Sequence, residues 1–125
     1  MSAQTCTASV ASGAISATTT VYLSHAQPGE WKLTRQTMAP QAATAADGSN
    51  KYVIAFTQGS DTVATSHDTS ATLLTAGTPL AMTLTTTAGD AAHLGATDKL
   101  TIVCTETGTA TMSAEFIATF DKVRV

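Results

Sequence analysis

Apolar and polar residues alternate at every second position over several stretches of this chain, a pattern typical of strands with one buried face. The clearest stretch is 51–57, where Tyr52, Ile54 and Phe56 share one face. Shorter or less regular stretches of the same kind are 19–24, 31–37, 62–66, 73–75, 80–84, 99–105 and 113–120. The pattern therefore predicts an all-β domain of about eight short strands.

Turn-forming residues separate these stretches. Residues 25–29 and 76–79 contain Pro and Gly, and residues 58–61 read as a hairpin turn. We expect a loop over 38–50, because Pro40 and a turn cluster flank its alanines, and another over 88–97, with His93 in a short helical turn. Short strands joined by such turns indicate an antiparallel β-sandwich or jelly roll.

The first 18 residues differ from the rest. They consist mainly of Ser, Ala, Thr and Gly, and after Met1 their only larger apolar residues are Val10 and Ile15. We therefore predict an extended N-terminal arm over residues 1–18 and one β-sandwich domain over 19–125.

Composition predicts a thin core. The chain has 125 residues, enough for one domain, and Thr is its commonest residue. Hydrophobic residues make up 43% of the chain, but alanine supplies much of this fraction. Because each buried Leu- or Phe-sized side chain is worth about 1.5 to 3 kcal/mol, we expect association with further copies or with a larger scaffold to add stability.

Charge and hydropathy exclude two classes of partner. Six basic and nine acidic residues give a net charge of -3 without clusters, so we expect no nucleic-acid binding. No apolar run approaches the roughly 18 residues of a membrane-spanning helix, and the N-terminus does not resemble a signal peptide. We expect folding in the cytoplasm, with Cys6 and Cys104 as free thiols.

The side chains that carry catalytic chemistry are scattered. His25, His67 and His93 lie in separate loops without a second ligand at metal-binding spacing. The sequence has no nucleophile elbow and no phosphate-binding loop. Most aspartates lie in predicted turns, where they bond their own backbone, namely Asp47, Asp61, Asp68, Asp90 and Asp98. We predict no metal, no cofactor and no enzymatic activity.

Trp31 is the single tryptophan, and Lys32 and Arg35 follow it. One interpretation is a core residue, and the other is an aromatic anchor of a protein interface flanked by basic residues. Our predicted interface combines Trp31, Lys32 and Arg35 with Val10 and Ile15 of the arm.

Residues 45–125 contain Thr-rich predicted strands separated by Gly turns, most clearly in segments 47–53, 75–84 and 99–110. In this order and composition, including a long penultimate strand that ends in a Thr-Gly-Thr turn, the chain resembles small capsid decoration (cement) or head-fibre proteins of tailed phages. It departs from the pattern at 91–97, where an insertion precedes a strand.

The resemblance implies a jelly-roll subunit that forms a homotrimer and clamps major capsid proteins on the capsid exterior, after assembly in the host cytoplasm. Residues 1–18 would then lie along a neighbouring subunit as an added strand. Two other classes stay open: a fibre or surface glycan-binding β-sandwich with aromatics and carboxylates in one pocket, and a cupin-like enzyme with the three histidines around a metal.

Overall fold

The computed structural model describes residues 4–44, 48–71, 74–85 and 93–123. Within these ranges the chain forms strands and no helix, so it contains no helix that could cross a membrane. The strands are β1 (Thr5–Ala11), β2 (Thr19–Leu23), β3 (Trp31–Pro40), β4 (Lys51–Gln58), β5 (Asp61–Asp68), β6 (Leu80–Met82), β7 (His93–Leu94), β8 (Leu100–Thr107) and β9 (Ala114–Lys122).

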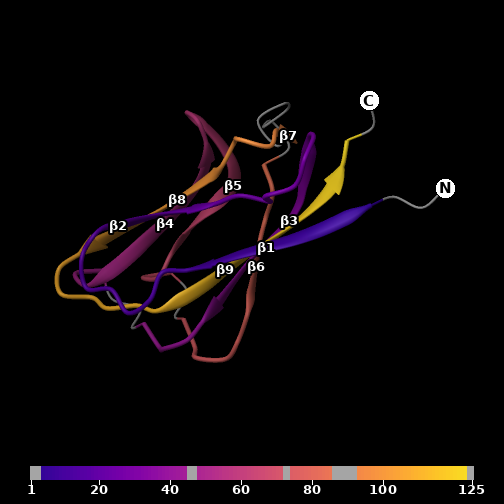
Figure 1. The fold of residues 1–125 in the computed structure, drawn as a ribbon. Helices are drawn as coiled ribbons and strands as arrows, with labels where there is room; N and C mark the ends of the chain where they lie inside the picture. Colours follow the sequence, from indigo (N-terminus) through magenta and orange to yellow (C-terminus); the bar gives the residue numbers. More distant parts are fainter. Residues whose placement is uncertain (1–3, 45–47, 72–73, 86–92, 124–125) are drawn as a thin grey trace.

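The strands form two antiparallel sheets that make a β-sandwich (Figure 1). The first sheet has the order β1-β9-β3-β6, and β7 also pairs with β3. The second sheet has the order β2-β8-β4-β5. The all-β prediction and the sandwich are therefore confirmed.

The strand pairs are nested along the chain. β4 pairs with β5 through the predicted hairpin, where Gln58 lies opposite Asp61 and Gly59 has a φ of 63°. Outside this hairpin β3 pairs with β6, β2 with β8, and β1 with β9. Each of the segments after β1, β2 and β3 carries the chain from one sheet to the other, so that neighbours in sequence pack across the core.

The inward faces of both sheets fill one hydrophobic core. Alternate residues of β4, β8 and β9 are buried except at the C-terminal end of each strand, as the alternation predicted. Phe56 of the second sheet and Phe116 of the first meet with ring centroids 6.1 Å apart at 71°, an edge-to-face contact between the layers. The largest fully buried side chains are Tyr52, Phe56, Phe116, Phe120, Leu23, Leu33, Met38, Ile54, Leu74, Leu94, Leu100 and Ile102.

The N-terminal segment is not an arm outside the domain, at least over β1. Thr5–Ala11 pairs along its whole length with β9 of the same chain. Cys6, Ala8 and Val10 face inward and pack against the core. These small side chains give only a weak apolar–polar alternation in the sequence. The strand forms because it pairs with β9.

Two predicted loops contain strand residues. β3 continues to Pro40, because β9 pairs with it on one side and β6 on the other. His93 and Leu94 form β7, not a helical turn, because they pair with the first two residues of β3. Leu74 makes an isolated bridge to Thr44, and the rest of the predicted strand 73–75 lies partly outside the described residues.

Candidate interaction surfaces

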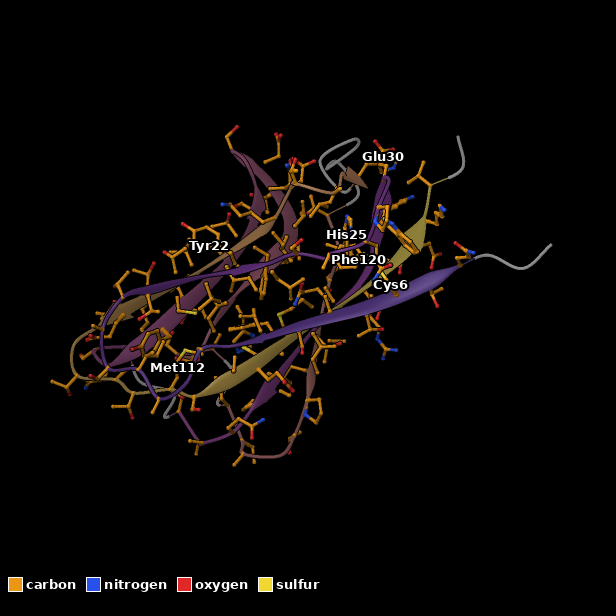
Figure 2. All side chains as sticks on the ribbon, in the orientation of Figure 1. Cys6, Tyr22, His25, Glu30, Met112 and Phe120 are labelled. Carbon is orange, nitrogen blue, oxygen red and sulfur yellow. The ribbon has the colours of Figure 1, made fainter. Side chains whose placement is uncertain are left out.

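Trp31, the predicted interface anchor, is a core residue. Its side chain is only 5% exposed, and its indole N–H donates to the Pro28 carbonyl at 3.0 Å. The ring lies 6.1 Å from that of His25, which in turn meets Phe120 edge to face at 5.4 Å. This aromatic cluster closes one end of the sandwich, and Figure 2 shows His25 and Phe120 together there.

The remaining predicted interface residues do not form one patch. Lys32 and Arg35 are exposed on the outer face of the first sheet. Lys32 lies opposite Asp121 of β9 in the strand register. Val10 and Ile15 are half-buried and pack inward against the core.

The structure does not gather the histidines. His25 is buried; its Nδ1 accepts the Gln27 N–H at 3.0 Å, so its Nε2 carries the proton donated to the Leu94 carbonyl at 2.9 Å. His93 instead pairs with Glu30 at 3.2 Å on the surface. Over the described ranges, no three His, Cys, Asp or Glu side chains are placed to hold a metal ion.

Both thiols are free in the structure. Cys104 is buried in β8, and desolvation raises its pKa to about 11, which keeps the thiol protonated and unreactive at neutral pH. Cys6 is half-buried in β1, and burial raises its pKa as well. Neither is a nucleophile activated by its surroundings.

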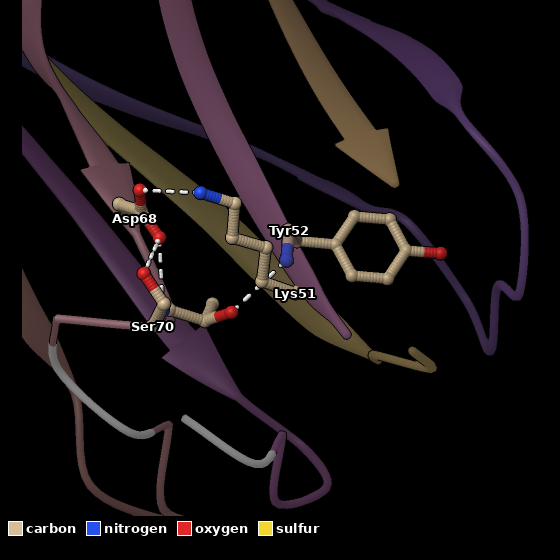
Figure 3. Close-up of polar contacts among 5 residues, drawn as sticks. Lys51, Tyr52, Asp68 and Ser70 are labelled. Atoms are coloured by element: carbon tan, nitrogen blue, oxygen red, sulfur yellow. Dashed lines mark hydrogen bonds and ion pairs between the residues drawn. The ribbon is translucent and has the colours of Figure 1, made fainter. Parts of the chain in front are cut away.

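Two of the predicted turn aspartates, Asp68 and Asp98, bond nearby backbone as turn residues do, whereas Asp61 begins β5. Asp47 and Asp90 lie outside the described residues. Asp68 accepts hydrogen bonds from the Ser70 N–H at 2.8 Å and the Ser70 hydroxyl at 2.6 Å, and it forms an ion pair with Lys51 at 3.2 Å (Figure 3). These contacts lower the pKa of Asp68, with the Ser70 hydrogen bonds as the main cause. Asp98 similarly accepts the Gly95 N–H at 2.8 Å.

Three shallow hollows lie at the ends of the sandwich. One of about 520 Å³ is lined by Gln4, Thr5, Cys6, Gln27, Pro28, Trp31 and Lys122. A second, of about 280 Å³, is lined mainly by threonines and alanines, and a third, of about 220 Å³, lies beside Ile15 and Met112. No carboxylate lines any of these three, so they lack the acid groups expected of a glycan or metal site.

The outer face of the second sheet is uncharged over its centre. The strand registers place Thr20, Val103 and Ala55 side by side, with Tyr22, Thr101 and Thr57 in the next row. Tyr22 is 54% exposed and is the only exposed large hydrophobic side chain of the described residues (Figure 2). The Lys99 ammonium lies 4.8 Å from the centre of its ring.

The second surface is the free edge of the first sheet. On its outer side β1 has no strand partner among the described residues. The side chains of Thr5, Thr7, Ser9 and Ala11 are exposed there. Neither this edge nor the central face of the second sheet was predicted from the sequence. The absence of charged residues in 5–11 was a signal for the edge, and the alternation around Tyr22 was a signal for the face.

We found no match to this chain among protein-family models, curated proteins or solved structures.

Proposed function

We propose that this chain is a structural virion protein, a decoration subunit that binds the major capsid protein lattice from the capsid exterior after assembly in the host cytoplasm. The observation that carries the proposal is the broad, uncharged outer face of the second sheet. The centres of protein interfaces are depleted of charged residues, whereas enzymes need convergent polar groups. A surface of this kind suits binding to another protein.

We further propose that the sandwich is a jelly roll. Its support is the nested order of the strand pairs around the β4–β5 hairpin, which is a long hairpin rolled into two sheets. With β7 set aside, the remaining strands divide equally between the sheets, as in a double-sheet jelly roll of eight strands. Jelly rolls are common in viral capsid proteins, which agrees with a virion role but does not by itself assign one.

The two outer faces differ in charge, and this difference supports one of them as the proposed capsid-binding side. The first sheet carries Lys32, Arg35, Glu115 and Asp121 on its outer face. On the second sheet, charges lie at its corners and the central rows carry Thr, Ala, Val and Tyr. We therefore place the capsid contact on the second sheet.

Co-sedimentation with undecorated capsid shells, assembled from the major capsid protein of the same source, tests the proposal. The wild-type chain should sediment with the shells to a fixed saturating ratio and raise their melting temperature. Val103→Glu should abolish this binding, because it puts a charge at the centre of the uncharged face. Thr119→Glu is the matched control, since Thr119 is equally half-exposed on the outer face of the first sheet, and it should bind as the wild type does.

The proposal fails if the wild-type chain stays in the supernatant at every shell concentration. If both variants bind like the wild type, the second-sheet contact is wrong. Exposed Tyr22 favours one alternative, a glycan-binding module, because saccharides stack on open aromatic rings. In that case a glycan array should give saturable binding that Tyr22→Ala removes.

A further inference from the structure

Two hydrogen bonds show which residues of β1 direct their backbone groups toward β9 and which direct them toward the free edge. Just beyond its ends, the Ser12 N–H donates to the Ala114 carbonyl and the Lys122 N–H to the Gln4 carbonyl, both at 2.9 Å. In an antiparallel ladder, residues that bond the partner strand alternate with residues whose N–H and C=O point away. The even-numbered residues of β1 therefore bond β9, and the odd-numbered residues direct their backbone groups outward.

Four residues thus present backbone groups that have no partner among the described residues, namely Thr5, Thr7, Ser9 and Ala11. Their side chains are small, uncharged and exposed. The register with β9 runs from Thr5 to Ala11 without a shift, so no bulge twists this edge away. Natural sheets protect an exposed edge with charge, proline, a bulge or a covering segment, and β1 has none of the first three.

The other edges are protected or short. β5 is covered near its middle, where the Thr65 N–H donates to the Thr83 carbonyl at 2.8 Å and the Thr85 N–H donates to the Val63 carbonyl at 2.9 Å. β6 has three residues and β2 has five. The only described edge that matches β1 in length and regularity is β1 of another copy.

We propose that β1 pairs antiparallel with β1 of a second copy about a two-fold axis at Ala8, which joins the first sheets of two chains into one continuous sheet. In this register Thr5 lies opposite Ala11 and Thr7 opposite Ser9 of the second copy. All four outward-directed residues then exchange backbone hydrogen bonds, about eight in total across the pair.

The same register also covers apolar surface. Ala8 lies opposite Ala8 of the second copy, and Cys6 lies opposite its Val10. These three side chains face inward and are only half-buried in the single chain, so pairing extends the core across the new strand junction. No charge is buried in this process, because Thr5–Ala11 contains none.

The inference does not depend on the capsid proposal, because it concerns the purified chain alone, and it proposes two copies where the phage resemblance implies three. Light scattering coupled to size exclusion should give twice the chain mass of 12.7 kDa. Thr7→Lys combined with Ser9→Lys places four like charges at the junction and should reduce the mass to that of one chain. Thr20→Lys combined with Thr105→Lys is the charge-matched control on the second sheet, and it should stay dimeric.

A disulfide test fixes the register. Ala8→Cys, made in a Cys6→Ser background, should form a dimer that survives denaturation without reductant. A facing pair without hydrogen bonds has Cα atoms about 4.5 Å apart, within the range for a disulfide. Ser9→Cys in the same background is more exposed but lies diagonal to its copy, about 7 to 8 Å away, and should not cross-link.

The proposal is overturned if light scattering gives the wild type the mass of one chain at every protein concentration tested, or the mass of three chains. It is also overturned if the second-sheet control dissociates as the edge variant does. Equal cross-linking through residues 8 and 9 overturns the register. Circular dichroism of each variant should match the wild type, which separates loss of pairing from loss of folding.

Discussion

Replacing Gly108 by alanine should destabilise the fold more than the same change at Gly77. Both glycines have left-handed backbone conformations, with φ of 74° and 78°. A Cβ at Gly77 would meet no atom of the described residues within 4 Å, whereas a Cβ at Gly108 would overlap the Ser49 carbonyl and the side chain of Asn50. Both substitutions therefore carry the cost of a left-handed L-residue, and Gly108→Ala also carries the cost of the overlap with Ser49 and Asn50.

The shared cost is the left-handed conformation, about 1 to 2 kcal/mol for an L-residue. The second cost applies to Gly108 because Asn50 Oδ1 accepts hydrogen bonds from the Thr109 N–H and hydroxyl at 2.9 and 3.0 Å. These bonds join the turn after β8 to the start of β4. Displacing Asn50 weakens both, at about 0.5 to 1.5 kcal/mol each. We expect losses of about 1.5 kcal/mol for Gly77→Ala and about 3 to 4 kcal/mol for Gly108→Ala.

Urea unfolding followed by tryptophan fluorescence measures both, because Trp31 is the only tryptophan and is buried. All variants are compared at one protein concentration, so that self-association contributes equally. Asn50→Ala provides a further control: it removes the part of the additional cost of Gly108→Ala that comes from the Asn50 side chain, whereas the overlap with the Ser49 carbonyl remains. In that background Gly108→Ala should cost less than in the wild type but still more than Gly77→Ala. Equal losses for the two glycine variants would refute the close contact between these segments.

Three further predictions concern the core and its polar groups. Phe56→Leu and Phe116→Leu should be coupled by about 0.5 to 1.5 kcal/mol in a double-mutant cycle, because their rings meet edge to face; zero coupling would argue against this packing of the layers. Gln36→Met should stabilise the fold by about 1 kcal/mol in urea unfolding, because Gln36 Oε1 is buried without a partner among the described residues, and Nε2 makes only long hydrogen bonds to the Thr37 and Ile117 carbonyls at 3.3 and 3.4 Å; a loss of stability would contradict this interpretation. The pKa of Asp68 is lowered, chiefly by its hydrogen bonds from Ser70. The stability these contacts give is therefore present above the ordinary aspartate pKa of about 3.9 and is lost as pH falls through the lower folded value. Asp68→Asn should flatten that acid limb, and an unchanged pH profile would count against it.

The sequence was sufficient for the central strands of the fold. β4 and β8 carry large apolar side chains at alternate positions, such as Ile54 and Ile102, and both are central strands of their sheet. Alternation of large side chains is a strong signal because burial on one face dominates the choice of structure. The hairpin at Gly59 was predictable for a local reason, since its residues favour a tight turn.

The edges and strand ends were not predictable in the same way. β1 buries Cys6, Ala8 and Val10, side chains too small to give a clear period. β7 is two residues long and exists because β3 offers free backbone groups beside it. The role of Trp31 was also open in the sequence, where a core residue and an interface anchor both fitted, and its contact with His25 now shows how the ring is buried.

The unequal edges of the sandwich also bear on how far its association can extend. On one side residues 83–85 run from β6 of the first sheet to β5 of the second, which covers that edge. If β1 is the pairing edge, the contact is isologous, and each copy uses its edge once. Assembly by this route then stops at two chains, whereas a second open edge of similar length would permit an unlimited ribbon. A regular, uncharged edge strand therefore does not lead to open-ended association of this chain, because the proposed dimer covers the edge that the single chain exposes.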